Sequence, residues 1–413
     1  MQTQQRTTDG FWAFHDHWSD WLHRDLPALN RAAEDGHLSP EEFVAAVRPW
    51  INELGAKHVP GVRQISRWEA RKLIQLTGFL VSSTERHFQA TGTAPGTGLS
   101  RLPGVDHMLC ELARVAQHPP RDSHYTYWLW NTGNKPLTFT GDSQEVFFHR
   151  AVCITHWLHT ASCDAVRPIC QGYIPVASGD AATALHQAAQ NTVALHRHYQ
   201  AFMEKDAVEP TRRSMEPWFF MTRMRTYLPT YPIAGESWGG VNAANLVAQM
   251  QIDYLIGTTD EKYVDIVRGR RRYLTPEDWH ALEADMVLPS VVDVLLQQLE
   301  LTPQEVIACK SPVLEAHIAK QSPEFQASLI AYAQLFQAAG KLTAMHWALI
   351  KNYLDKPAAK LSQEERARLP VPPDHGTGGK THEETRAIRD MRREHPVLKK
   401  LVDGINRVLS TSF

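Results

Sequence analysis

The sequence has few cysteines and no pattern that would use them as a scaffold. Its 413 residues include five cysteines, which is an odd number, and no CxxC pair occurs. A disulfide framework and a zinc ribbon are therefore disfavoured as sources of stability.

Long apolar runs and an excess of one charge are also missing. No stretch approaches the ~18–20 apolar residues that a membrane-spanning helix needs, and residues 1–10 contain no apolar segment of the signal-peptide type. The net charge is −2, so no overall field points to nucleic acid or an anionic membrane as a partner. We therefore expect a cytoplasmic protein with neither of these partners; whether it is a monomer or a homo-oligomer is left open.

Several catalytic motifs are absent. The sequence has no GxSxG elbow, no HExxH and no Cys–His signature, which removes support for the hydrolases that use them. The glycine-rich turn at 376–380 is not a P-loop, because Asp374 stands where that pattern needs its first glycine. Because no strand is predicted before it, the turn is not a dinucleotide-binding fingerprint either.

The features that are present indicate an all-α protein. Apolar residues recur at helical spacing in most long segments, whereas 173–177 is the best strand candidate. The length allows two domains, and we place the boundary after Pro119-Pro120, giving a small domain at 1–120 and a large one at 121–413. The proline-rich stretch 356–380 is predicted to be a mobile loop. The predicted helices are 68–88, 106–117, 145–166, 181–204, 242–256, 290–301, 303–309, 324–354 and 381–409.

His346 lies in an apolar helical run at 342–353. Leu342, Leu349 and Ile350 share its helix face. A buried imidazole needs a partner, which is either a backbone carbonyl or a metal such as haem iron. A different metal site is conceivable on helix 145–166, where His149, Cys153 and His156 follow at helical spacing and His159 lies nearby.

Two further features could bind a small anion. Arg223 and Arg225 lie among aromatic residues at 217–228, and arginine suits bidentate capture of a carboxylate; a surface arginine lying over apolar residues is equally compatible. The turn at 376–379 could offer backbone N–H groups and the Thr377 hydroxyl to a carboxylate, or could serve only as a hinge.

In this order, the pieces resemble indoleamine 2,3-dioxygenase. That enzyme belongs to the histidine-ligated haem aromatic oxygenase superfamily, which also includes tryptophan 2,3-dioxygenase and the pyrrolnitrin-pathway enzyme. The resemblance runs from about Leu26 to Val408. The matching elements are Asn134-Lys-Pro-Leu-Thr138, Phe147-Phe148, the run from Phe219 to Leu228, Trp238-Gly-Gly240, Asp253-Tyr-Leu-Ile-Gly257, His346 and Gly376-Thr-Gly-Gly379.

The resemblance implies a helical fold with a small N-terminal domain over a large one that binds b-type haem, with O2 as co-substrate. His346 would be the proximal iron ligand, and Arg225 would bind the substrate carboxylate. Thr377 and Gly378 would close over the amino-acid end of the substrate, and Phe147 would pack on its aromatic ring.

The sequence departs from the family pattern on the distal side of the expected haem. Ala151 stands where the family has a small hydroxyl residue, and the pocket-wall aromatic falls between His124 and Tyr127. Lys380 replaces the usual Ser or Thr, and 176–217 is longer than is typical.

Three functions follow from the resemblance. The first is dioxygenase cleavage of the indole C2–C3 bond of L-tryptophan, or of a related indoleamine, to an N-formylkynurenine-type product. The second is biosynthetic oxygenation of a modified tryptophan or indole, with monooxygenation or ring rearrangement. The third is a non-catalytic haem-binding sensor.

Overall fold

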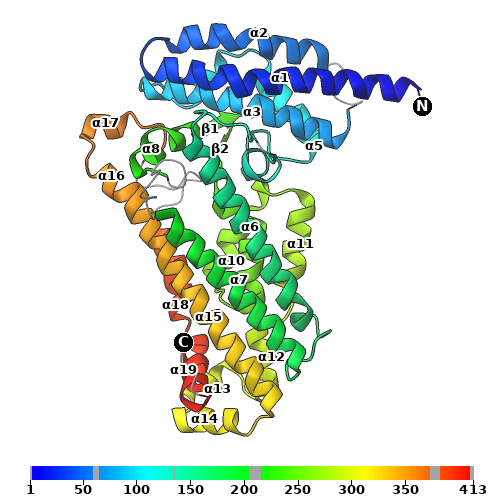
Figure 1. The fold of residues 1–413 in the computed structure, drawn as a ribbon, viewed down its shortest axis with the longest axis vertical. Coiled ribbons are helices and arrows are strands. Elements are labelled where there is room, and N and C mark those ends of the chain that lie inside the picture. Colours follow the sequence, from blue (N-terminus) through cyan, green and yellow to red (C-terminus); the bar gives the residue numbers. More distant parts are fainter. Residues whose placement is uncertain (1, 59–64, 134, 204–214, 373–381, 410–413) are drawn as a thin grey trace.

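The computed structural model describes residues 2–58, 65–133, 135–203, 215–372 and 382–409, and it is all-α apart from one small hairpin (Figure 1). The hairpin pairs β1 (Tyr231–Ile233) with β2 (Glu236–Trp238) in antiparallel register. The all-α prediction is confirmed. Within these residues, no helix combines the length and the apolar character needed to cross a membrane.

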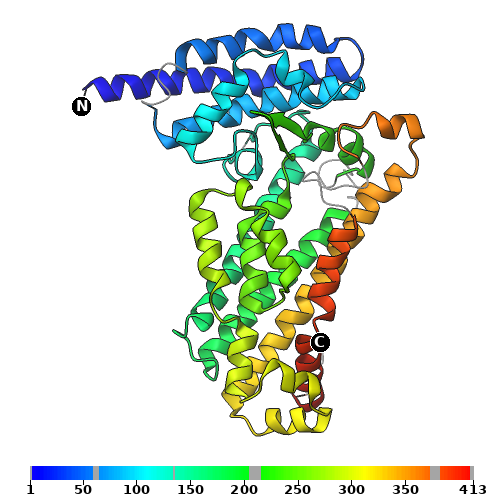
Figure 2. The ribbon, with the colours of Figure 1, turned by 180° about the vertical axis from the view of Figure 1, so that it is seen from behind.

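The N-terminal helices lie across one end of an elongated body (Figures 1 and 2). They are α1 (Gln2–Glu34), α2 (Pro40–His58), α3 (Arg67–Ala90), α4 (Thr97–Ser100) and α5 (Val105–Ala116). Helix α3 begins with a capping box, in which the Ser66 side chain accepts from Glu69 N and the Glu69 side chain accepts from Ser66 N. The sequence therefore fixes the start of this helix locally, close to the predicted residue 68.

The body is built on three long helices that pack along its length. Helix α7 (Gly179–Met203) packs against both α6 (Ser143–Cys170) and α15 (Pro323–Ile350). Buried alanines on α7 and α15 allow close approach of the two backbones. The shorter body helices are α8 (Pro217–Thr222), α9 (Val247–Ile256), α10 (Glu261–Arg268), α11 (Pro276–Met286), α12 (Val291–Gln298), α13 (Pro303–Ala308), α14 (Ser311–Ala319), α18 (His382–Glu394) and α19 (Pro396–Leu409).

The predicted strand at 173–177 is wrong. This segment forms the turn between α6 and α7, and the N–H groups of Tyr173 and Ile174 both donate to the carbonyl of Pro168. The Tyr173 side chain is 79% exposed, so the apolar composition of the segment does not reflect a buried strand. The predicted loop at 356–380 contains two short helices, α16 (Lys356–Ala358) and α17 (Gln363–Ala367), and its last residues, from 373, lie outside the described part.

The two predicted domains share one hydrophobic core. Its buried residues include Trp18 and Leu73 from the N-terminal helices and Trp128, Phe139 and Ala151 from beyond residue 120. A boundary near residue 120 would therefore divide continuous packing, and it stays a proposal.

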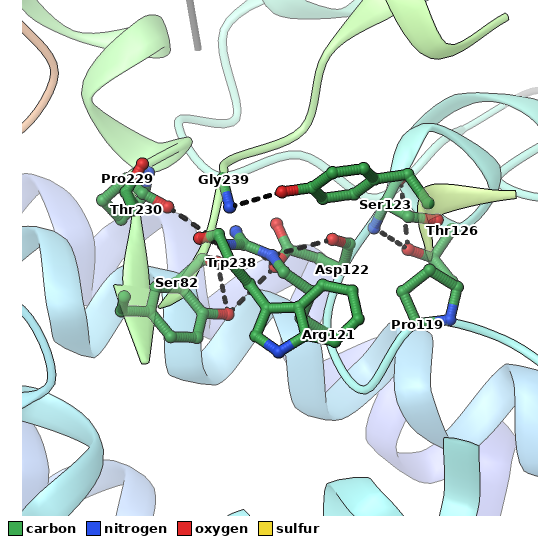
Figure 3. A network of polar contacts seen from close by, with 12 residues as sticks. Ser82, Pro119, Arg121, Asp122, Ser123, Thr126, Pro229, Thr230, Trp238 and Gly239 are labelled. Atoms are coloured by element: carbon green, nitrogen blue, oxygen red, sulfur yellow. Dashed lines mark hydrogen bonds and ion pairs between the residues drawn. The ribbon is translucent and has the colours of Figure 1, made fainter. Parts of the chain in front are cut away.

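A buried ion pair joins the chain that follows α5 to the hairpin (Figure 3). Arg121 is 0% exposed, and its Nη2 lies 2.9 Å from Asp122 Oδ1. Its Nη1 donates to the carbonyl oxygens of Pro229, at 3.1 Å, and Trp238, at 2.9 Å. Tyr231 donates its hydroxyl to Asp122 Oδ1 at 3.0 Å, and its ring lies under the guanidinium. One arginine thus holds both flanks of the hairpin against the chain that follows α5.

Arg121→Ala is expected to lower the free energy of unfolding by roughly 3–5 kcal/mol, because it leaves a buried carboxylate without its cation. It also leaves the two hairpin carbonyls without their donor. Urea unfolding measures the change. The matched control is Arg24→Ala, which removes a pair with Asp25 whose arginine is 76% exposed, and little change is expected there. Equal effects of the two substitutions would contradict the structural role of Arg121.

Buried histidines should make the protein less stable as the pH falls below neutral. Burial lowers the pKa of His118 to about 3 and that of His149 to about 4. The same groups take up a proton near pH 6.5 in an unfolded chain. Between about pH 6.5 and 4 the unfolded state therefore binds more protons than the folded state. The free energy of unfolding decreases as the pH is lowered through this range. Each such histidine contributes a slope of up to ~1.4 kcal/mol per pH unit.

The pH dependence is measured by urea unfolding across this range. His118→Asn should flatten the slope by about one proton, whereas the same change at the exposed His37 should leave it as it is. A stability that stays constant over this range would refute the prediction.

Candidate functional site

A cavity of about 360 Å³ lies inside the helical body. Its walls come from α6, α7, α9, α15 and α18, together with the chain around the hairpin. The lining is mainly apolar, with Phe148, Ile252 and Leu335 among its larger side chains. An apolar pocket with a few convergent polar groups is the usual form of a small-molecule site.

His346 borders this cavity from the last turns of α15. The start of α15 is fixed by Ser322, which accepts from Phe325 N, and by Pro323 in the first turn. The His346 side chain is exposed, yet protein surrounds it, so its exposed surface faces the cavity. Burial, followed by the charge of Arg392, lowers the pKa of His346 to about 4. The imidazole is therefore neutral at pH 7, which is the form that ligates metals.

No hydrogen bond to the His346 ring is found within the described part of the chain. The nearest aromatic neighbour is Tyr199 on α7, whose ring centroid is 6.2 Å away. The sequence left two interpretations of His346 open. The first, a core histidine bonded to a backbone carbonyl, is not found among the described residues. The ring is instead available to a ligand in the cavity.

His159 on α6 is a second histidine in the cavity wall. Burial, followed by the charges of Arg392 and His156, lowers the pKa of His159 to about 3. The alternative metal site on this helix gains no support: Cys153 Sγ lies 3.9 Å from His149 Nδ1, and the described residues contain no group of three metal-ligating side chains. From the sequence, His159 was predicted only as a member of that possible metal site.

Arg225 borders the cavity near the N-terminal helices, from the 3-10 turn Met224–Tyr227. It is 2% exposed, and its Nη1 and Nη2 donate to the carbonyls of Val371, at 2.9 Å, and Pro372, at 3.0 Å. Arg225 therefore holds the chain just before the glycine turn. Thr377 and Gly378, in that turn, lie outside the described residues.

An acidic residue of the first helix positions the Arg225 turn. Glu34 accepts from the Tyr227 hydroxyl at 2.6 Å and from Arg223 Nη2 at 2.6 Å. The Tyr227 ring is stacked on Phe139, with centroids 5.0 Å apart and planes at 9°. These contacts fix the residues on both sides of Arg225, so α1 contributes to the site without bordering the cavity.

The distal residues predicted from the sequence divide between the cavity and the core. Ala151 borders the cavity, whereas the lining contains Phe148 in place of its neighbour Phe147. Phe147 stacks on Phe202, with centroids 5.2 Å apart. Consecutive helix residues point about 100° apart, which explains why one phenylalanine borders the cavity and the other packs beside it.

His124 and Tyr127 are buried away from the cavity lining. Tyr127 donates its hydroxyl to Glu145 Oε1 at 2.7 Å, and neither ring nitrogen of His124 has a hydrogen-bond partner among the described residues. Trp128, which follows Tyr127, borders the cavity instead.

A charged cluster that sequence analysis missed lies at the cavity wall. Asp253 on α9 accepts from the Tyr263 hydroxyl at 2.5 Å and forms an ion pair with Arg392 on α18. All three side chains border the cavity. The available signal was an aspartate inside the apolar run 252–256, because a buried carboxylate needs a cationic partner.

Comparison with known proteins identifies the family. A family model described as monodechloroaminopyrrolnitrin synthase PrnB matches residues 61–403, which is most of the chain and includes every residue of the cavity lining. No curated protein gives a significant match. The chain therefore belongs to the monodechloroaminopyrrolnitrin synthase PrnB family, whose enzymes are haem-dependent oxygenases that act on tryptophan-like substrates.

Proposed function

We propose that this protein is a biosynthetic haem-dependent oxygenase that converts tryptophan, or a modified tryptophan or indole, into a monooxygenated or rearranged product. His346 is the residue we propose as the proximal ligand of a b-type haem. The family match supports a biosynthetic role, because the family is described as a synthase. The observation that carries the cofactor assignment is the neutral His346 ring bordering the cavity with no hydrogen bond among the described residues.

The residues around the cavity fit a haem. An iron ligand must be a neutral imidazole, and the low pKa of His346 provides one at physiological pH. Apolar walls suit a porphyrin, and small side chains such as Ala151, Ala243 and Ala339 in the lining leave room within the cavity. When bound, haem would supply the binding and activation of O2; the protein supplies position and environment.

The side chains near Arg225 would hold and orient the substrate. Arg225 is the residue we propose for the substrate carboxylate, since guanidinium groups bind carboxylates in fixed geometry. Phe148, Leu228 and Val241 border the cavity with apolar surface that would pack on an indole and exclude water. Binding at the carboxylate end would thus fix the ring at the reacting end. Phe147 would support Phe202 and Phe148 from behind, and Thr377 and Gly378 are proposed contacts for the amino-acid end.

The side chain at position 151 has no hydroxyl. Ala151 can neither hold nor move a proton, so any proton transfer must use the substrate itself or another group. Cleavage of L-tryptophan to N-formylkynurenine needs no general base if the indole N–H stays protonated, and it remains the alternative outcome of the same site. A haem-binding sensor without turnover is the third possibility.

Removing His346 should abolish the spectrum of histidine-ligated haem. We expect His346→Ala to weaken hemin binding by roughly a hundredfold or more, since even outer-shell changes cost 10–100-fold, and added imidazole should restore the ferrous–CO spectrum. The matched control is His159→Ala, which removes the other cavity histidine. Loss of the spectrum in His159→Ala alone would instead make His159 the ligand.

Product analysis distinguishes the candidate reactions. The reconstituted enzyme is incubated with reductant, ¹⁸O2 and either L-tryptophan or ring-substituted tryptophans. The masses of the products are then measured by mass spectrometry. The biosynthetic proposal expects a product with at most one labelled oxygen or a rearranged carbon skeleton. N-formylkynurenine carrying two labelled oxygens would support the dioxygenase, and a haem spectrum without oxidation of any indole would support the sensor.

A further inference from the structure

We infer that Arg392, supported by Arg389 one turn earlier on α18, forms a carboxylate-binding site for a propionate of the haem. This inference rests on the proposed function. It adds a second anchor for the cofactor, on a helix that follows the glycine turn and is far in sequence from His346.

Arg392 has hydrogen-bonding capacity that the protein does not use. Its Nη2 pairs with Asp253 Oδ2, whereas its Nε is buried and has no partner among the described residues. The Arg392 side chain is 14% exposed and borders the cavity. A buried guanidinium with an unused donor is incompletely paired. The exposed part of this side chain borders the cavity, where a ligand carboxylate would find a cationic partner.

The charge of the cavity wall favours an anionic ligand. Four arginines border the cavity, namely Arg225, Arg270, Arg389 and Arg392, and Asp253 is the one acidic side chain in this lining. Arg389 also pairs with Asp390, which lies outside the lining. A wall that presents several guanidinium groups and one carboxylate favours an anionic ligand such as a carboxylate.

The position of α18 favours the propionate over the substrate as the partner of Arg392. Helix α18 packs on α15, and Arg389 Cζ lies 5.1 Å from the ring centroid of Trp347, the residue after His346. Both arginines therefore lie beside the segment that carries the proposed iron ligand. Arg225, by contrast, is in the turn that directly follows α8, and the neighbouring Tyr227 bonds to Glu34 of α1; Figure 1 shows α8 beside the N-terminal helices. There Arg225 would serve the substrate end.

The test compares hemin with its dimethyl ester, in which both carboxylates are blocked. Each porphyrin is titrated into full-length apoprotein, and affinity is read from the Soret band. Wild type should prefer hemin. Arg392→Gln should weaken hemin binding by roughly tenfold to a hundredfold, the range for a buried charge-assisted hydrogen bond, and should leave ester binding unchanged.

Two further variants distinguish loss of the carboxylate contact from a general loss of folding. Arg392→Gln leaves Asp253 buried without its cation, so the double variant Asp253→Asn/Arg392→Gln removes the whole pair and should show the same loss of preference for hemin. Arg407→Gln is the matched control on the next helix, since it removes an arginine whose partner is Glu315 at the surface, and it should bind both porphyrins as wild type does.

The outcomes separate the inference from the proposed function. Equal affinity of wild type for the two porphyrins, or equal weakening of both in Arg392→Gln and the double variant, would overturn the inference alone. So would unchanged hemin affinity with weaker binding of tryptophan relative to tryptamine, which would assign Arg392 to the substrate carboxylate. A wild-type protein that binds neither porphyrin would reject the proposed function itself.

Discussion

The structure depends on keeping a cavity open in the middle of a helical body. Helices close over apolar voids unless contacts outside the void hold them in place. Here three segments of the wall are tied by buried charged side chains. Arg121 holds the hairpin before the wall residues 241–244, and Glu145 accepts from Phe139 N, Thr140 N and Tyr127 at the start of α6. Glu34 fixes the turn of Arg225. Arg121, Glu145 and Glu34 lie behind the lining, which is mainly apolar and carries its own polar cluster at Asp253 and Arg392.

This arrangement gives the first helix a role in the site. The family match begins at residue 61, after α1 and α2. Nevertheless, Asn30 of α1 donates to Ser83 Oγ and to the carbonyl of Phe139, and it contacts His87 Nε2 at 2.9 Å. The N-terminal helices therefore pack as one unit with the body. Their contribution is to position the Arg225 turn and the start of α6, and they do not border the cavity themselves.

Much of the fold and half of the site could be predicted from the sequence. Helical periodicity located α3, α6, α7 and α15, whereas α1 and α2 were not among the predicted helices. The order of the motifs located His346, Arg225 and Ala151, all of which border the cavity. Periodicity gives little information on a three-residue strand, so the hairpin at 231–238 was missed. The choice between Phe147 and Phe148 depends on a rotation of about 100°, which a helix boundary uncertain by one or two residues cannot resolve.

The charged cluster was hidden for a different reason. Asp253 and Arg392 are 139 positions apart, and nothing local in the sequence pairs them. The pairing has a physical consequence for stability. Arg392 is largely buried at the cavity wall, and its Nε has no hydrogen-bond partner among the described residues, which opposes folding. An anionic ligand that binds only the folded state removes this cost and stabilises the fold by mass action. The buried arginine that lowers the stability of the protein is thus a source of affinity for an anionic ligand, and ligand binding and fold stability are linked.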